Sequence, residues 1–308
     1  MSAALEARAE VAKLARLLGS APEELDYLTK ARPDDVRRFR EQLTDALFDR
    51  DKARFGRLAA PSRILPAQLA ATIAERALGP MLCARLSGLI EPDKAIDIAK
   101  RLPAPFLVEV AIEMDPRRAK DVIARVPAEL VATVARELAD RGETVTMGRF
   151  VGYLGDDALA AAIAGMDDFA LLETAFVMEG KERLDRILKL LPPERLRAMV
   201  ATAEQRGLWD ETLDLLMLVS PQRRATLVQT ALDTGVEGIL PSLFAAVDST
   251  GSWESGLRML AELPPDSKQQ LAAYASTLNG TERLRALKQA EALHLTKELG
   301  PIGEALKR

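Results

Sequence analysis

The chain repeats one pattern of apolar and polar positions: an apolar helix end, then proline or an acidic pair, then a new amphipathic helix. In residues 92–114, apolar side chains recur at spacings of three and four, which places them on one face of a helix. Proline is tolerated in the first turn of a helix and pushes the residue before it out of helical geometry. The pattern therefore predicts helices that stop and restart within residues 90–93, 102–105, 114–117, 126–129, 191–194, 219–222 and 263–266.

The spacing of the prolines gives the length of the repeat. Pro92 and Pro116 are 24 residues apart, and so are Pro103 and Pro127, which indicates a unit of two short helices. A helix of about three turns is marginal by itself, so neighbouring helices must cover its apolar face. Residues 188–203 and 260–275 also align without gaps, which indicates a duplicated element. We predict an all-α protein in which residues 63–308 form an α-solenoid of short paired helices.

Residues 1–62 lack this pattern and are predicted to form a separate N-terminal helical segment. A helix is expected over residues 5–18, ended by Gly19. Ser20 and Glu23 have the spacing of a capping box and predict the next helix start. A further helix is expected after Pro33. Its buried side should carry Val36, Phe39, Leu43, Leu47 and Phe48.

Helix starts and loops are predicted by different signals in the second half of the chain. Acidic pairs at residues 156–157 and 167–168 replace proline, as the positive end of the helix dipole favours. Loops are expected at residues 140–146 and 248–252, and residues 235–247 are read as a helix with an imprecise boundary. The last helix is expected over residues 281–299, before Gly300 and Pro301.

Three of the helix restarts resemble those of a known family. Residues 114–119 (Met-Asp-Pro-Arg-Arg-Ala), 191–195 and 263–266 resemble the cytosolic N-terminal superhelical domain of MgtE-type magnesium transporters. More distantly they resemble the armadillo-like region of the flagellar motor-switch protein FliG. The similarity covers roughly residues 90–231, and the transporter's regulatory and membrane domains have no counterpart. The resemblance implies a right-handed superhelix with a regulatory or docking role, and not magnesium transport.

Composition narrows the class of protein. Of 308 residues, 48% are hydrophobic, 29% charged and only 4% aromatic, which favours a folded helical protein. A net charge of -4 argues against a general nucleic-acid binder. A single cysteine, Cys83, indicates a reducing compartment, so we expect a cytoplasmic protein. No apolar stretch is long enough to span a membrane. Residues 64–90 are predicted to form a buried helical hairpin, and contact with a membrane surface is the alternative.

No constellation of catalytic or metal-binding residues is recognisable in the sequence. One histidine, His294, and one cysteine cannot build a zinc cluster of histidines and cysteines or a site with several histidines. A histidine between leucines is typical of a helix surface or of packing. Glycine-rich phosphate loops do not occur. The acidic pairs could meet a hard cation, but their place at helix starts explains them as well. We therefore predict no enzymatic activity, no catalytic residue, no cofactor and no metal.

Arginines give the candidate contact surface. They recur just after helix starts, and comparable positions of stacked repeats lie along one edge. The alternative for these side chains is ion pairing with nearby Asp and Glu. The candidate partner-binding residues are Arg117, Arg118, Arg195, Arg197, Arg223 and Arg224.

The sequence thus favours a non-catalytic cytoplasmic interaction or regulatory scaffold with a protein partner and without nucleic acid. The alternative function is a carrier or sensor that binds an apolar small molecule or lipid between helical layers. Flexible methionine side chains could line such a site, or they could fill the core. They are Met166, Met178, Met199, Met217 and Met259.

Overall fold

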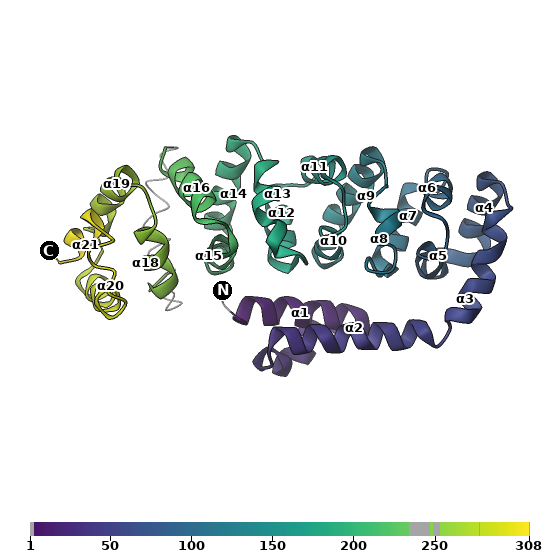
Figure 1. The fold of residues 1–308 in the computed structure, drawn as a ribbon, viewed down its shortest axis with the longest axis horizontal. Coiled ribbons are helices and arrows are strands. Elements are labelled where there is room, and N and C mark those ends of the chain that lie inside the picture. Colours follow the sequence, from purple (N-terminus) through teal and green to yellow (C-terminus); the bar gives the residue numbers. More distant parts are fainter. Residues whose placement is uncertain (1–2, 234–246, 249–252, 277, 308) are drawn as a thin grey trace. The chain divides into compact units, whose positions relative to one another are not determined.

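The computed structural model describes residues 3–233, 247–248, 253–276 and 278–307, and over these residues it contains helices and no strand (Figure 1). The all-α prediction is therefore confirmed. The chain divides into two compact units, Ser2–Lys181 and Glu182–Arg308, which we describe separately. The division expected at residue 62 lies inside the first unit. Two predicted features, the helix over residues 235–247 and the loop at residues 248–252, lie almost wholly outside the described residues.

The first unit consists of an N-terminal segment followed by short stacked helices. Its elements are α1 (Ala3–Leu18), η1 (Pro22–Lys30), α2 (Pro33–Asp49), α3 (Lys52–Ala59), η2 (Ala60–Arg63), α4 (Ala67–Ile73), η3 (Ala74–Leu78), α5 (Gly79–Ser87), α6 (Pro92–Ala99), α7 (Ala104–Glu113), α8 (Lys120–Ile123), α9 (Ala128–Asp140), α10 (Thr144–Phe150), α11 (Asp156–Ala164) and α12 (Asp168–Val177).

Helices two apart in sequence pack against each other within this unit. Helix α5 contacts α7, α7 contacts α9 and α9 contacts α11, while α4 contacts α6 and α10 contacts α12. Apolar side chains spaced by three and four fill the space between these helices; in α7 they include Leu107, Val108 and Ala111. Short helices therefore stack on one another in this unit, whereas the α-solenoid expected from the proline spacing stays a prediction.

Most of the predicted helix starts are confirmed. Helix α6 begins at Pro92, α7 and α9 begin directly after Pro103 and Pro127, and Asp167 caps α12 by accepting a hydrogen bond from the Ala170 N–H at 2.7 Å. Residues 116–118 are the exception, because they form a turn, and α8 begins only at Lys120. Helix α10 begins at Thr144, so the loop expected at residues 140–146 is shorter than predicted.

The N-terminal arm, which we define as residues 3–49, folds as a pair of helices joined by η1. Gly19 ends α1 with a φ of 67°, as expected. Its own apolar core is formed by Val11, Leu14 and Val36, with Leu25, Leu28 and Leu43 packed against them. In Figure 1 the arm runs along one side of the stacked helices, where α1 contacts α10 and α12.

Two predictions about the arm are wrong. The cap before η1 is Ala21 rather than Ser20, because the element begins at Pro22 and the Glu24 carboxylate accepts a hydrogen bond from the Ala21 N–H. Helix α2 buries Val36, Arg40, Thr44 and Phe48, whereas Phe39 and Leu47 are 55% and 50% exposed. The predicted apolar stripe fails because α2 packs on the rest of the arm through Val36 and Leu43 and contacts the stacked helices through charged side chains, such as Arg40 and Asp45.

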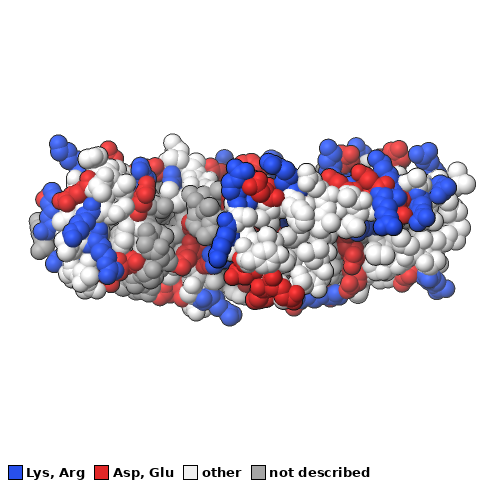
Figure 2. Space-filling model, turned by 90° about the horizontal axis from the view of Figure 1, so that it is seen from below, with Lys and Arg blue, Asp and Glu red and all other residues white. Residues whose placement is uncertain are grey.

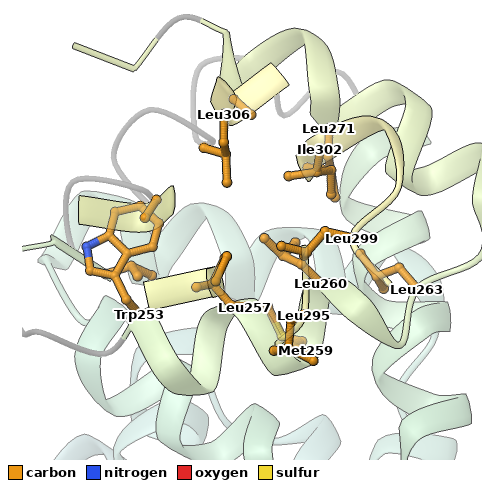
Figure 3. Close-up of a cluster of buried hydrophobic side chains, with 14 of the residues drawn as sticks. Trp253, Leu257, Met259, Leu260, Leu263, Leu271, Leu295, Leu299, Ile302 and Leu306 are labelled. Carbon is orange, nitrogen blue, oxygen red and sulfur yellow. The ribbon is translucent and has the colours of Figure 1, made fainter. Parts of the chain in front are cut away.

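The second unit is also built from short helices around an apolar cluster. Trp253, Leu257, Leu260, Leu299 and Ile302 are buried in this cluster, which Figure 3 shows between α18, α19 and the last helices. The elements are η4 (Lys181–Arg183, which begins at the last residue of the first unit), α13 (Leu184–Lys189), α14 (Pro193–Arg206), α15 (Trp209–Leu218), α16 (Pro221–Asp233), α18 (Trp253–Ala261), α19 (Pro265–Ala275), α20 (Gly280–Ala292) and α21 (Pro301–Lys307).

The single long helix predicted for residues 281–299 is wrong. Helix α20 ends at Ala292, and His294 has a φ of 57°, which is the left-handed conformation that stops a helix. The sequence shows no glycine there, so the break was not visible in it. His294 is exposed beyond the helix end.

Candidate functional site

The candidate site is the surface on which the stacked helices of the first unit hold the arm. Its first part is the arginine corner, which we define as Asp115, Arg117 and Arg118 in the turn between α7 and α8. The Asp115 carboxylate accepts hydrogen bonds from the Arg117 backbone N–H at 3.1 Å and from the Arg117 guanidinium at 3.0 Å. An aspartate that bonds to the backbone two residues later favours a turn over a helix. This bond explains why Pro116 does not start a helix, and it orients Arg117.

Gly88, at the end of α5, holds the corner close to the neighbouring helix. A Cβ atom on Gly88 would overlap with the backbone carbonyl of Arg118. Glycine is the residue that permits such a close approach of two backbones. The position of the corner therefore depends on a residue that is distant from it in sequence.

The corner faces three carboxylates on one side of α2. Glu41, Asp45 and Asp49 are spaced by four, so they lie on the same helix face. Arg117 pairs with Asp45 at 3.2 Å and Glu41 at 3.8 Å, and Arg118 pairs with Asp45 at 2.6 Å and Asp49 at 3.9 Å. Two guanidinium groups thus converge on the same carboxylate oxygen of Asp45, each through a charge-assisted hydrogen bond.

An aromatic contact completes the corner. The Arg118 guanidinium carbon lies 3.9 Å from the centroid of the Phe48 ring, within the range of a cation–π interaction. Phe48 is 3% exposed, and its ring lies 5.4 Å from that of Phe55 in α3. The corner therefore contacts an aromatic side chain as well as the acidic face of α2.

A second group of charges, which we call the buried network, lies where α1 and α2 meet the segment after α12. Glu10, Lys13 and Arg40 belong to the arm and are 1%, 3% and 5% exposed. Glu10 pairs with Lys13 at 2.8 Å, with Arg40 at 3.1 Å and with Arg37 at 3.2 Å. Glu179, from the stacked helices, pairs with Arg40 at 2.8 Å and with Lys13 at 3.7 Å. Buried charges are tolerated only with such partners.

Gly148 positions Glu179. The Glu179 N–H donates a hydrogen bond to the Gly148 carbonyl at 3.0 Å. A Cβ atom on Gly148 would lie 2.9 Å from Cγ2 of Val177, closer than real Cβ atoms come, and 3.1 Å from the Met178 nitrogen, which is a tight contact. The missing side chain thus lets α10 and the segment after α12 approach, and their approach presents the Glu179 carboxylate to the arm.

A third ion-paired contact joins α1 to Glu143, the residue before α10. Arg16 pairs with Glu143 at 2.7 Å, and the Glu143 carboxylate also accepts a hydrogen bond from the Thr146 hydroxyl at 3.0 Å. Thr146 is fully buried and therefore fixes the carboxylate. Ion pairs thus connect the arm to the stacked helices at the corner, at Glu179 and at Glu143.

The pKa shifts of the buried network follow from burial and from the neighbouring charges. Burial alone raises the pKa of Glu10, but the nearby charges of Lys13, Arg40 and Arg37 outweigh it, so this pKa is below its ordinary value. Burial lowers the pKa of Lys13, and Glu10 and Glu179 oppose that shift. Each charge in the network is therefore held by the others, and removing one leaves its partners uncompensated.

The arginines predicted to form one contact ridge belong to both units of the chain. Arg117 and Arg118 meet in the corner, where each side chain is about one quarter exposed. The other four lie in the second unit: Arg224 is buried and pairs with Glu262 at 2.7 Å, Arg195 and Arg223 are half-buried, and Arg197 is exposed. That the six form one continuous ridge stays a prediction.

The buried network is not predicted by any pattern used above. Its residues resemble ordinary charges on solvent-exposed helix faces, and Glu179 lies far along the chain from Glu10 and Arg40. One signal was present: Arg40 lies four residues after Val36 and eight before Phe48, so it shares the face of two buried side chains. A charged residue on the same helix face as buried apolar residues indicates that the helix packs against more than one neighbour.

Cys83 is expected to react slowly as long as the protein is folded. Burial raises the pKa of its thiol to about 11 from an ordinary value of 9.0, and the thiol lies 3.7 Å from the Ala74 carbonyl. At pH 8 the thiolate fraction should then be about 100-fold below that of an unperturbed cysteine. Labelling of the Cys83 thiol with a chromogenic disulfide at pH 8 should be slow in buffer and fast in 6 M guanidinium, where the protein is unfolded. Equal rates would contradict the expectation.

The described residues contain no group of three or more His, Cys, Asp or Glu side chains placed to hold a metal ion. Within the same residues, none of the helices combines the length and the apolar character needed to cross a membrane. Three of the methionines considered as ligand-lining residues, Met166, Met178 and Met259, are buried, and Met259 lies in the cluster of Figure 3. Comparison with protein-family models, curated proteins and solved structures finds no match for this chain.

Proposed function

We propose that the protein is a non-catalytic cytoplasmic interaction module that binds a protein partner on stacked helix pairs. The observation that carries this proposal is the arm itself: the stacked helices of the first unit hold a two-helix segment through the arginine corner, Glu179 and Glu143. A surface that binds one helical segment in cis has the chemistry to bind another in trans. The right-handed superhelix implied by the resemblance to MgtE-type transporters belongs to the same proposal.

The polar character of this interface supports a binding role. Interfaces that open and close within a chain are more polar than permanent ones, and paired charges contribute specificity and association rate. In Figure 2, which views the molecule from the side of the arm, basic and acidic side chains lie next to one another instead of in separate fields. Such a surface fits a partner with a defined charge pattern better than a uniformly charged polymer.

Charge reversal at the predicted contact arginines should weaken partner binding without unfolding the protein. The full chain would be immobilised, proteins from the source cells captured, and the retained proteins compared between the wild type, R117E/R118E and R195E/R197E. We expect at least one protein to be retained by the wild type and depleted several-fold by one reversal, with unchanged helical circular dichroism. Arg224 is left unchanged because its burial would confuse stability with binding.

The matched control is R125E/R141E. These two arginines form exposed ion pairs with Asp93 and Glu109 elsewhere on the first unit. Because two arginines are again replaced by glutamate, the change in net charge equals that of R117E/R118E. If the same proteins are retained equally by all four chains, neither arginine surface binds a partner and the proposal fails.

A further inference from the structure

We propose that the arginine corner recognises an acidic amphipathic helix of a protein partner, and that the arm occupies the corner until such a helix displaces it. The partner helix would carry carboxylates at positions i, i+4 and i+8 and an aromatic residue at i+7. This inference rests on the proposed function and names both the partner class and the regulation of that site. It is built from the contact between α2 and the corner.

The side-chain pattern expected of the partner helix is that of α2, the segment of this chain that occupies the corner. Glu41, Asp45 and Asp49 supply the three carboxylates, and Phe48 supplies the aromatic ring under Arg118. These spacings place all four side chains near one face of a helix. A helix in trans with the same spacing would meet the same two guanidinium groups.

The corner keeps its shape without α2. Asp115 holds the Arg117 guanidinium and backbone from within the same turn, and its side chain is only 9% exposed. Gly88 fixes the Arg118 backbone against α5. A binding site whose donors are oriented before the ligand arrives loses less entropy when the ligand binds.

The arm is built to be released as one body. It has an apolar cluster of its own, because Val11, Leu14 and Val36 pack within the arm. Its buried cations also have a partner of their own, because Glu10 pairs with Lys13, Arg37 and Arg40, all of which belong to the arm. Lifting the arm about the two residues between α2 and α3 would break the ion pairs to the stacked helices and leave that internal network in place.

The contacts at the corner suit exchange with a competitor. The side chains of Asp45 and Asp49 are 48% and 60% exposed, and ion pairs with exposed partners contribute little stability each. The arm nevertheless competes at high effective concentration, because it is tethered to the surface that it covers. A partner should therefore bind the wild type weakly and a chain with a weakened arm more tightly.

The test uses a fluorescent synthetic peptide with the sequence of α2 and the full-length chain carrying E41Q, D45N and D49N. We expect the peptide to bind this chain about tenfold more tightly than it binds the wild type, as measured by fluorescence anisotropy in 50 mM salt, and less tightly in 500 mM. The same peptide carrying E41Q, D45N and D49N should not bind. Addition of R117Q/R118Q to the chain should abolish binding, whereas R125Q/R141Q should leave it unchanged.

Displacement of the arm is measured separately. Tyr27 in η1 and Glu129 in α9 are exposed, so Y27C and E129C in a C83A background accept a donor and an acceptor dye. Saturating peptide should lower the energy transfer between them, because the arm moves away from the stacked helices. Peptide binding with unchanged transfer would overturn occupation of the site by the arm. Absence of peptide binding to the weakened-arm chain, with normal circular dichroism, would overturn the partner class.

The two proposals fail differently. If a cellular protein is lost on R117E/R118E while the acidic peptide does not bind, the interaction module stands and the partner is not an acidic helix. If the peptide binds and displaces the arm while no cellular protein depends on any arginine surface, the corner recognises acidic helices and the proposed cellular function is wrong.

Discussion

Replacing Glu10 with glutamine is expected to lower the free energy of unfolding by about 3–5 kcal/mol. Glu10 is 1% exposed and is shared by Lys13, Arg37 and Arg40. Glutamine has the same shape but no charge, so the buried cations would keep only Glu179 from the stacked helices. Removing one member of a buried ion network leaves the others desolvated and unpaired. Urea denaturation followed by circular dichroism at pH 7 measures the loss.

The matched control is D34N, which removes one negative charge from the same arm. Asp34 is 81% exposed and lies 3.7 Å from Arg37, so its pairing is screened by solvent. Its loss should be much smaller than that of E10Q. Equal effects of the two substitutions would mean that burial does not increase the contribution of Glu10, and would contradict the assignment of a buried ion network.

The Glu10 carboxylate should also make the free energy of unfolding depend on pH. The pKa of Glu10 is lowered from its ordinary value of 4.5 in the folded protein, because the surrounding cations outweigh the effect of burial. A carboxyl group with a lowered pKa contributes its full stabilisation above the ordinary value and loses it as the pH falls through the folded value. The difference in stability between wild type and E10Q should therefore be constant near neutral pH and shrink below about pH 4.5.

Replacing Gly88 with alanine is expected to lower the free energy of unfolding by about 2–3 kcal/mol. The added Cβ would overlap with the Arg118 carbonyl, which is a backbone atom and cannot rotate away as a flexible side-chain end could. Either α5 or the turn that carries the arginine corner must shift. The substitution should therefore also weaken binding of the acidic peptide, since the corner loses the position that Gly88 permits.

The control for this substitution is G56A in α3. Gly56 lies inside a helix, and a Cβ atom there would meet nothing within 4 Å. Alanine is favoured over glycine in a helix, so G56A should leave stability unchanged or raise it by about 0.5–1 kcal/mol. Thermal unfolding of both variants distinguishes the clash at Gly88 from a general effect of alanine. A stable G88A variant with an unchanged corner would contradict the proposed packing.

Helix boundaries were predictable where a local signal decides them. Proline at residues 92, 103 and 127 and Gly19 act through their own backbone geometry, and the structure confirms the starts and the end that they predict. Pro116 carries the same signal but does not start a helix. The Asp115 side chain bonds to the Arg117 N–H and stabilises a turn instead. A rule based on proline alone does not include a neighbouring side chain that accepts a backbone hydrogen bond and so favours a turn.

The buried side of α2 shows where prediction from pattern stops. Apolar periodicity selects Phe39 and Leu47, which the structure leaves exposed, and passes over Arg40, which it buries. Periodicity assumes that a helix has one apolar neighbour. Helix α2 has two neighbours, the rest of the arm and the stacked helices, and the second of these interfaces is made with charge.

The sequence by itself determined that this protein is helical, where most of its short helices begin, and that those helices need neighbours. These properties depend on residues within one or two turns of each other. Only the tertiary structure decided that Arg117 meets Asp45, 72 residues away, that Arg16 meets Glu143, 127 residues away, and that Arg40 meets Glu179, 139 residues away. Charges so far apart in sequence become neighbours only when all the helices between them pack against one another. A pattern within one or two helical turns carries no information about that packing.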